Sequence, residues 1–272
     1  MAGARRGGVR GWPRRRRGWL AYISNAVVSV FFPSGCRICQ RVLTSASRVP
    51  ICKECLSSFE RVPYIACEVC GQLLPAWAQK EGVPLLCPAC RDRTNAFDRA
   101  RSFAVYEDAV VRAILLLKFE QIEPLGGCFA ERLAEVVKVE GDRLAADVVV
   151  PVPLYRERER ERGYNQAALL SKPLAKRLRL PHKAVLPMRT RARPDKQVLS
   201  LEERWESVRG AFATRPGSQV DNVRDLLVDD VLTTGATLDA CARALREAGV
   251  RSVIGLTVAR AVRNPLPSTR EW

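Results

Sequence analysis

The chain has 272 residues, of which 47% are hydrophobic and 27% charged, and 45 Lys and Arg against 29 Asp and Glu give it a net charge of +16. This composition excludes a wholly disordered polypeptide and predicts one substantial core with room for a second, small module. The chain contains a single histidine, His182, which argues against a histidine-based catalytic triad or a histidine-rich catalytic metal site.

The first 33 residues combine a basic tail with a short, mainly apolar segment. Residues 1–20 contain seven arginines and no acid, and residues 19–32 follow as an apolar run of 14 residues. The arginines at 14–17 give this region a resemblance to a twin-arginine signal peptide, but it has no small-x-small cleavage site. The run is also too short to cross a bilayer as a helix. We expect residues 1–33 to be a basic tail and an amphipathic helix of a cytoplasmic protein without integral membrane insertion; binding to a membrane surface is the alternative.

Residues 34–95 are rich in cysteine. Eight of the ten cysteines form four Cys-x-x-Cys pairs, namely Cys36 with Cys39, Cys52 with Cys55, Cys67 with Cys70, and Cys87 with Cys90. Two such pairs supply the four sulfur ligands of a structural Zn²⁺ site, so residues 34–95 are predicted to form a double zinc ribbon with two sites. Sequential and interleaved, cross-braced pairings both fit the spacing. Redox chemistry at Cys-x-x-Cys is the rival interpretation. Cys128 and Cys241 lie in apolar stretches and are expected in the core.

From residue 100 onward, strand and helix patterns alternate. The predicted strands are 101–106, 147–152, 225–228 and 251–259; the predicted helices are 109–119, 129–139, 165–178, a short one that ends near 209, and 237–248. Pro173 is expected to kink or split the third helix, and Gly249 to end the last one. This alternation predicts an α/β domain over 100–262, with a mainly parallel sheet flanked by helices, and leaves 263–272 as a C-terminal tail.

The segment after the strand at 225–228 has the chemistry of a sugar-phosphate site. Asp229 and Asp230 follow the apolar run, and the hydroxyl-rich loop Val-Leu-Thr-Thr-Gly-Ala leads into a helix near Thr237. Backbone N–H groups at such a helix start bind phosphate, and the two carboxylates accept hydrogen bonds from ribose hydroxyls. The loop lacks the features of a Walker loop and of a dinucleotide fingerprint. The alternative is a threonine-capped helix beside two solvated carboxylates.

Four motifs in order carry a resemblance to a known family. Residues 228–237 resemble the phosphoribosyl pyrophosphate (PRPP) loop of type I phosphoribosyltransferases. The stretch 151–170, Leu-Lys-Phe at 117–119 and the stretch 203–212 are similar to the ComF/GntX-like subfamily, whose members carry an N-terminal double zinc ribbon. The resemblance runs from about residue 31 to 260. Ser207 stands where the subfamily usually has Asn, and Tyr164 where it usually has Phe.

The resemblance implies a set of site residues. Asp229 and Asp230 would hold the ribose hydroxyls and stabilise positive charge on the ribose during catalysis. The remaining residues implied to bind PRPP are Thr233, Thr234, Gly235, Ala236 and Thr237 around the 5-phosphate, Arg158, Arg162 and Asn165 on the pyrophosphate side, and Lys118. Residues 189–204 match the family's mobile loop that closes over the site. Simple surface salt pairing is the alternative for the alternating Arg and Glu residues at 156–162, and a side chain lying along the surface is the alternative for Lys118.

Two functions follow as hypotheses. In the first, the protein is a phosphoribosyltransferase that binds PRPP with Mg²⁺ and transfers the phosphoribosyl group to an acceptor that the sequence does not name. In the second, it is a non-catalytic competence protein that binds single-stranded DNA and supports DNA uptake, associated with the membrane through the competence machinery. The eight Lys and Arg of residues 172–193 suit the second hypothesis, and a solvated basic surface is the alternative. The aromatic residues Phe59, Tyr64 and Trp77 suit the stacking of bases and are equally suited to a small core. The sequence leaves the oligomeric state open.

Overall fold

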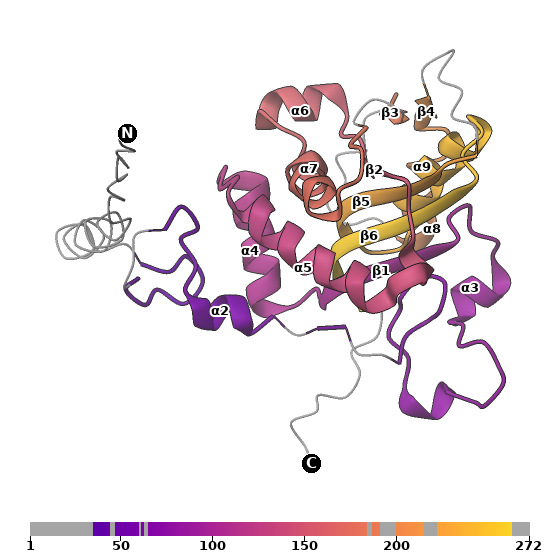
Figure 1. The fold of residues 1–272 in the computed structure, drawn as a ribbon, viewed down its shortest axis with the longest axis horizontal. Coiled ribbons are helices and arrows are strands. Elements are labelled where there is room, and N and C mark those ends of the chain that lie inside the picture. The colour runs from indigo at the N-terminus through magenta and orange to yellow at the C-terminus, as the bar shows by residue number, and fades with distance from the viewer. Residues whose placement is uncertain are drawn as a thin grey trace, which may run out of the picture. The chain divides into compact units, whose positions relative to one another are not determined.

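The computed structural model of the chain describes residues 35–43, 47–59, 61–62, 65–183, 187–190, 200–214 and 222–262 (Figure 1). The chain divides into two compact units, residues 1–56 and 57–272. The expected basic tail and helix at 1–33 and the tail at 263–272 lie outside the described residues. So do Tyr64 and residues 191–199 of the expected closing loop.

The described part of the first unit is held by tight turns around its cysteines. The Cys36 amide donates to the Arg41 carbonyl at 2.7 Å, and the Gln40 amide donates to the Cys36 carbonyl at 2.8 Å. A single bridge joins Gly35 to Val42. The short helix α2 (Lys53–Ser57) begins directly after Cys52 and contains Cys55, the second member of that pair. Turns of this kind bury little apolar surface, which is why such a small module relies on a metal for stability.

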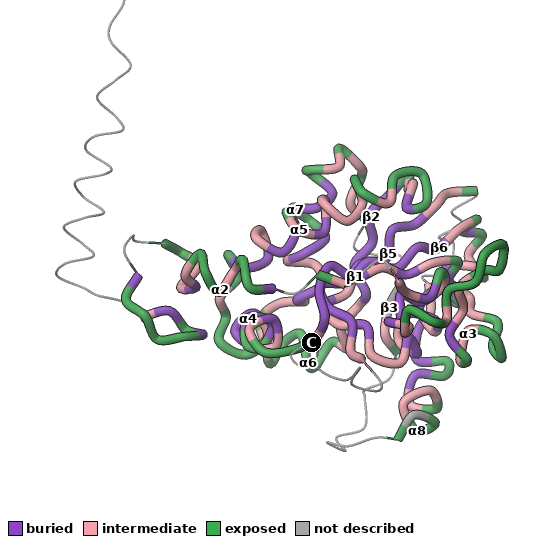
Figure 2. The backbone as a smooth tube through the Cα atoms, turned by 90° about the horizontal axis from the view of Figure 1, so that it is seen from below, coloured by how far each residue is buried: buried purple, intermediate pink, exposed green. Residues whose placement is uncertain are grey.

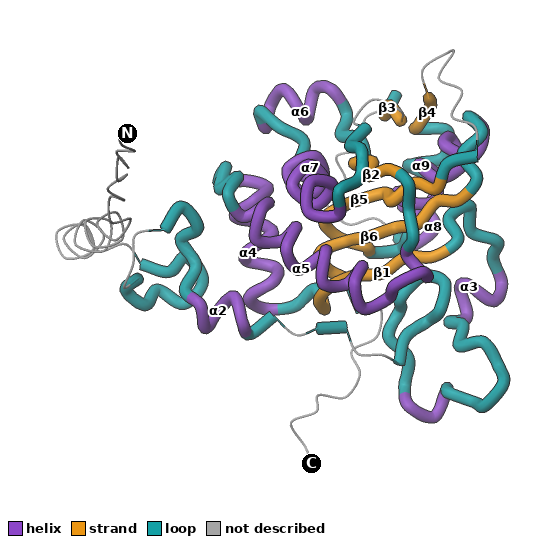
Figure 3. Tube along the Cα trace, in the orientation of Figure 1, coloured by secondary structure: helices purple, strands orange, loops and turns teal. Residues whose placement is uncertain are grey.

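The second unit is built on a parallel sheet of four strands in the order β1-β6-β5-β2. Figure 3 shows the strands side by side. The strands are β1 (Arg99–Val105), β2 (Val148–Pro151), β5 (Arg224–Leu232) and β6 (Ser252–Arg260), and a separate antiparallel pair is formed by β3 (Pro187–Arg189) and β4 (Phe212–Thr214). All four residues of β2 are buried, as expected for a strand covered on both faces (Figure 2).

Helices cover both faces of this sheet, which confirms the predicted fold class. Helix α5 packs on β1 and β6, helix α7 on β2 and β5, and helix α9 on β6 from the other face (Figure 1). The remaining described helices connect strands or cap the sheet. The bounds are α3 (Pro88–Asp92), α4 (Asp108–Phe119), α5 (Leu125–Glu140), α6 (Arg156–Arg162), α7 (Gln166–Leu178), α8 (Leu201–Glu206), α9 (Ala236–Glu247) and the 3₁₀ turns η1 (Ala76–Ala78) and η2 (Gly141–Leu144).

Helix α7 contains a proline at the place where it packs most closely on α5. Pro173 lacks an N–H, so the carbonyl of Leu169 has no helical donor four residues later. Gly126 of α5 packs against that carbonyl so closely that a Cβ on Gly126 would lie 2.5 Å from the Leu169 oxygen. Helix α7 is continuous from 166 to 178, so of the two predicted outcomes, a kink or a split at Pro173, the split is wrong.

Two other boundaries differ from the prediction. Strand β5 was predicted to stop at Val228, but it continues to Leu232, because β6 supplies backbone partners as far as the Leu232–Arg260 pair. Asp229 and Asp230 therefore lie within the strand. Helix α5 starts at Leu125, before two glycines that hide its beginning in the sequence. Gly249 follows α9 with a φ of 96°, as its predicted place at the helix end requires.

Candidate functional site

The candidate phosphate loop joins the end of β5 to the start of α9. Gly235 precedes the helix with a φ of 85°, a left-handed conformation that suits glycine. The Thr234 hydroxyl accepts a hydrogen bond from the Ala236 amide at 3.2 Å. Helix α9 is amphipathic, with Leu238, Cys241, Ala242 and Leu245 among its buried residues, so packing of this face on the sheet fixes where the helix begins. The amides at this helix start are suited to an anion.

Asp229 and Asp230 point to opposite faces of the sheet, because neighbouring residues of a strand alternate. Asp230 is 4% exposed and lies on the side of α4, where its Oδ2 is 2.8 Å from the Nζ of Lys118. Burial disfavours the charged form of Lys118, but the charge and hydrogen bond of Asp230 outweigh it and raise the pKa of Lys118. The structure thus brings Lys118, an uncertain site residue in the sequence, to the carboxylate pair.

Asp229 lies on the side of α9. Its Oδ1 accepts a hydrogen bond from the Asp230 amide at 2.9 Å, and it pairs with Thr257 in the ladder. Asp229 and Thr257 line a small cavity of about 20 Å³ together with Thr233, Gly235 and Thr237. Burial and the neighbouring charge of Asp230 raise the pKa of Asp229 to about 7. This carboxyl group is therefore poised to lose a proton when a cation approaches.

The residues expected on the pyrophosphate side lie on α6 and at the start of α7. Asn165 caps α7: its Oδ1 accepts from the Ala167 amide at 2.9 Å, and its Nδ2 donates to the Val152 carbonyl at 3.0 Å, which ties the turn after β2 to the helix. The guanidinium of Arg162 donates to Gln166 at 2.7 Å and lies 5.2 Å from the centre of the Phe119 ring, next to Lys118.

Arg158 occupies a different environment. It lies on α6, none of whose residues is buried, and forms an exposed ion pair with Glu161 at 3.8 Å. This ion pair lies within α6, as in the surface-pairing alternative, whereas Arg162 contacts α4 and Asn165 bonds the turn after β2.

The two cysteine tetrads are sequential, which decides the pairing that the spacing left open. Each brings four Sγ atoms to within 4.8 Å of one another, one tetrad from the first unit (Cys36, Cys39, Cys52 and Cys55) and one from the second (Cys67, Cys70, Cys87 and Cys90). The Cys39 and Cys52 sulfurs are 3.7 Å apart, and those of Cys70 and Cys87 are 3.6 Å apart. A tetrahedral ZnS₄ centre with 2.3 Å bonds has sulfur–sulfur edges of about 3.8 Å. Both tetrads can therefore hold zinc.

Backbone amides support the thiolate form of Cys36 in the first tetrad. The Cys52 amide donates to the Cys36 sulfur at 3.3 Å. Burial opposes ionisation of Cys36, but hydrogen bonds from the Cys39 and Cys52 backbone outweigh it and lower the pKa of Cys36 to about 6. Thiolates are the form that binds a metal.

The second tetrad belongs to the core of the α/β unit. Cys67, Cys70 and Cys87 are buried in one apolar cluster with residues of α9 and of the sheet, among them Leu238 and Ala100. The Ala100 amide of β1 donates to the Val69 carbonyl at 2.6 Å, between the first two cysteines. Cys241 is also buried in this cluster, as expected, whereas Cys128 of α5 is half-buried.

Arg260 was missed by the sequence analysis. It is the last residue of β6, is 2% exposed, and is among the largest fully buried side chains of the described residues. Its Nη1 donates to the carbonyls of Leu232 at 2.9 Å and Thr233 at 2.6 Å, at the start of the candidate phosphate loop. No sequence pattern flags an arginine that ends an apolar strand. The only signal is that a charge there must be paired if it is buried.

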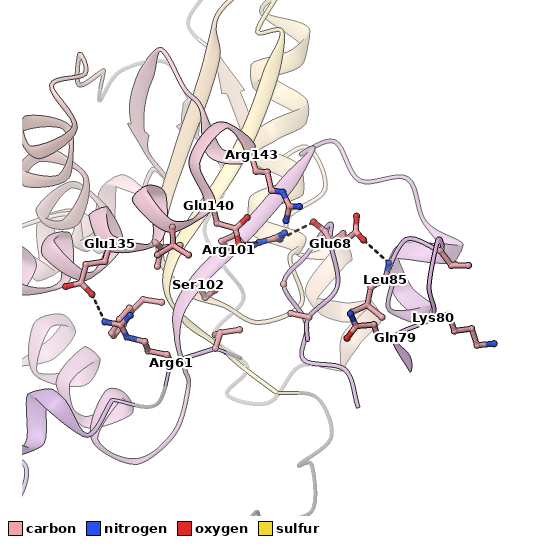
Figure 4. A pocket seen from close by; sticks show the side chains of 17 residues that line it. Arg61, Glu68, Gln79, Lys80, Leu85, Arg101, Ser102, Glu135, Glu140 and Arg143 are labelled. Carbon is pink, nitrogen blue, oxygen red and sulfur yellow. Dashed lines mark hydrogen bonds and ion pairs between the residues drawn. The ribbon is translucent and has the colours of Figure 1, made fainter. Parts of the chain in front are cut away.

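A cleft of about 470 Å³ lies beside β1 and α5 (Figure 4). Arg101 pairs with Glu140 at 2.9 Å and Arg61 with Glu135 at 2.7 Å, while Lys80 and Arg143 also line it. In the described part of the chain these last two cations have no ion-pair partner. Trp77, two residues from the lining residue Gln79, is 82% exposed.

Phe59, another aromatic residue considered for base stacking, is buried. Phe59 is 6% exposed and stacks on Phe129 with the ring centres 6.2 Å apart, so the expectation that it stacks on DNA bases is wrong. Within the described ranges, we find no helix with the length and apolar character that crossing a bilayer would require.

The chain is similar to one protein family and to several known proteins. A phosphoribosyl transferase domain family matches residues 165–269. The chain is 30% identical to competence protein ComFC of Bacillus subtilis over 78% of this chain and 84% of that one, and 30% identical to DNA utilization protein YhgH of Escherichia coli K12 over 81% and 94%. It is 29% identical to competence protein F of Haemophilus influenzae over 85% of this chain and 99% of that one. A solved adenine phosphoribosyltransferase from Thermoanaerobacter pseudethanolicus is 16% identical over 54% of this chain and 83% of that one, with a TM-score of 0.32.

The chain has a phosphoribosyltransferase domain that follows, in sequence, two cysteine tetrads that can bind zinc. It belongs to the ComF family.

Proposed function

We propose that the protein binds PRPP together with Mg²⁺ at the end of β5. The observation that carries the proposal is the arrangement of Asp229, Asp230 and the amides at the start of α9 on one strand-loop-helix unit. The 5-phosphate would bind to the loop from Thr233 to Thr237, where amides and hydroxyls converge. The carboxylates would accept hydrogen bonds from the ribose hydroxyls and would coordinate Mg²⁺, which prefers oxygen ligands.

The two carboxylates would have separate roles, because their environments differ. Asp230 is held in a fixed position by Lys118 at 2.8 Å. The pKa of Asp229 is raised to about 7 by burial and by the charge of Asp230, so approach of Mg²⁺ would release its proton. Mg²⁺ would neutralise charge on the pyrophosphate. Any transfer would break the bond between C1 of the ribose and the pyrophosphate oxygen and form a bond from C1 to an acceptor.

Binding is tested by calorimetry with Mg²⁺ and PRPP on the wild type and on Asp229→Asn. Glu247→Gln is the matched control, since it removes one carboxylate from an exposed position at the far end of α9. We expect binding to the wild type and to the control, and a loss of at least about tenfold in affinity in Asp229→Asn, which is a change of about 1.4 kcal/mol. Absence of binding to the wild type at saturating PRPP would overturn the proposal.

A second candidate function is the binding of single-stranded DNA in the cleft beside β1. Two observations favour it: the names of the relatives refer to competence and DNA utilization, and the exposed Trp77 is two residues in sequence from Gln79, which lines a cleft that includes Lys80 and Arg143. Stacking of a base on an exposed aromatic side chain contributes about 1–3 kcal/mol.

The test is fluorescence anisotropy of a labelled oligonucleotide at several salt concentrations. Trp77→Ala should weaken binding at least fivefold, and Lys80→Ala should reduce the salt dependence. Arg251→Ala, which removes an equal charge from an exposed position just before β6, outside both the cleft and the basic stretch 172–193, is the control. Equal affinities for all three variants and the wild type would place any DNA site elsewhere.

A further inference from the structure

Arg260 connects the second cysteine tetrad to the candidate phosphate loop. While its Nη1 binds the two loop carbonyls, its Nη2 donates to Gln72 Oε1 at 2.9 Å and lies 3.7 Å from the Sγ of Cys70. Gln72 closes the turn of the first cysteine pair, since its carbonyl accepts from the Cys67 amide at 2.8 Å. One buried side chain therefore touches a metal-ligating sulfur, the turn that presents it, and the loop.

The anchored carbonyls determine where the loop amides point. In a planar trans peptide the C=O and N–H point in opposite directions. Because Arg260 holds the carbonyls of Leu232 and Thr233, the amides of Thr233 and Thr234 are directed away from Arg260. These amides belong to the loop that the proposed function assigns to the 5-phosphate. Without Arg260, the Leu232 carbonyl keeps its hydrogen bond from the Ala261 amide at 3.0 Å, but the Thr233 carbonyl loses its Arg260 donor, so the Thr234 amide loses its fixed direction.

A second connection joins the same tetrad to the start of α9. The segment after Cys90 donates from the Ala96 amide to Asp239 of α9 at 2.7 Å. The ring of Phe97, which is 2% exposed, lies where a Cβ on Gly235 would be 3.8 Å from it. The cysteine-rich segment thus holds the phosphate loop from both ends, through Arg260 at its start and through Asp239 and Phe97 at the helix.

The charges favour this connection when a metal is bound. A Zn²⁺ ion with four thiolates carries a net charge of −2, and a buried guanidinium requires a nearby anion. Metal at Cys67, Cys70, Cys87 and Cys90 would both fix the turn that carries Gln72 and supply the negative charge beside Arg260. Groups that hydrogen-bond to metal ligands commonly change metal affinity by about 10–100-fold.

We propose that Arg260 is a positioning residue through which metal bound at the second tetrad orders the phosphate loop. As an account of ligand affinity this rests on the proposed PRPP function. The ordering of the loop and the retention of the metal do not require a ligand, and they can be measured in its absence.

The experiment compares Arg260→Met with Arg251→Met in the full-length, zinc-loaded protein. Arg251 precedes the same strand at its other end and is exposed, so it controls for loss of an arginine. In Arg260→Met we expect hydrogen exchange of the amides at 233–237 to become at least tenfold faster and one of two zinc ions to be lost to a chelator about tenfold faster. Affinity for Mg²⁺ and PRPP should fall by at least tenfold. Wild-type exchange and zinc release in Arg260→Met would overturn the proposal.

A second measurement on the wild type decides the matter if Arg260→Met does not fold. With Co²⁺ in place of Zn²⁺, the thiolate-to-cobalt absorption band reports on the eight cysteines of the two tetrads, Cys70 among them. Addition of Mg²⁺ and PRPP should shift that band, and no shift at saturating, calorimetrically verified binding would refute the connection. If the wild type binds no PRPP at all, the proposed function fails. The positioning role of Arg260 is then tested by comparing amide hydrogen exchange at 233–237 in the zinc-loaded wild type and in protein that has lost the zinc of the second tetrad. Equal exchange rates would refute it.

Discussion

The ion pair between Lys118 and Asp230 yields a quantitative prediction for stability. At 2.8 Å and an effective dielectric constant of about 20, the attraction between the two charges is about 6 kcal/mol. Desolvation offsets part of this attraction, because the side chain of Asp230 is only 6% exposed and that of Lys118 only 20% exposed. Removal of one partner leaves the other charge largely buried. We therefore expect Lys118→Met and Asp230→Asn each to lower the free energy of unfolding by about 3 kcal/mol.

The double variant tests whether the two residues act through each other. Lys118→Met/Asp230→Asn removes both charges, so its cost should be close to that of either single variant, which corresponds to a coupling energy of about 2–3 kcal/mol. Urea unfolding of the zinc-loaded protein, followed by circular dichroism, measures these values. The control is the same cycle on the exposed pair Arg209 and Glu206, which should show almost no coupling. If the Lys118 and Asp230 effects simply add, the structural argument is wrong.

Three further predictions concern other parts of the second unit and the first tetrad. Asp229, whose pKa is raised to about 7, holds a proton in the folded state that it loses near pH 4 when unfolded. The folded state therefore binds more protons than the unfolded state between pH 4 and 7. As the pH rises through this window, the free energy of unfolding of the wild type should fall relative to that of Asp229→Asn, by up to about 1.4 kcal/mol per pH unit. Urea midpoints of the two proteins that change in parallel from pH 5 to 8 would contradict this. Gly126→Ala, which places a Cβ 2.5 Å from the Leu169 oxygen, should cost about 1–3 kcal/mol in urea unfolding, whereas Gly127→Ala, where the space is open, should not. Metal analysis by mass spectrometry should find two zinc ions per chain, and one in Cys36→Ser/Cys39→Ser; two in that variant would show that its remaining sulfurs still bind.

The fold class and the cysteine sites could be predicted from the sequence because both depend on local patterns. Alternating strand and helix patterns and buried runs such as 147–152 predict a parallel sheet from residue types alone. Cys-x-x-Cys pairs place two sulfurs on one turn, so the tetrads are predictable from spacing. Which two cysteine pairs form one tetrad was not predictable from spacing, because it depends on how the turns fold back on one another.

The extent of β5 shows why strand ends were harder to predict. The run of apolar residues ends at Val228, and two aspartates follow it. The strand nevertheless continues to Leu232, because its pairing with β6 uses backbone groups that are indifferent to side-chain polarity. Asp229 and Asp230 consequently face opposite sides, which an apolar pattern does not reveal.

By itself, then, the sequence determined the elements, the cysteine sites and the location of the candidate loop between residues 229 and 237. The tertiary structure alone decided what holds that loop. Lys118, Asp230 and Arg260 come from helix α4 and two strands, and the partners of Arg260 include Gln72, 188 positions away. Contacts between residues so distant leave no periodic signal in a single sequence. Their strength comes from burial, because only removal from water makes a lysine or an arginine require its partner.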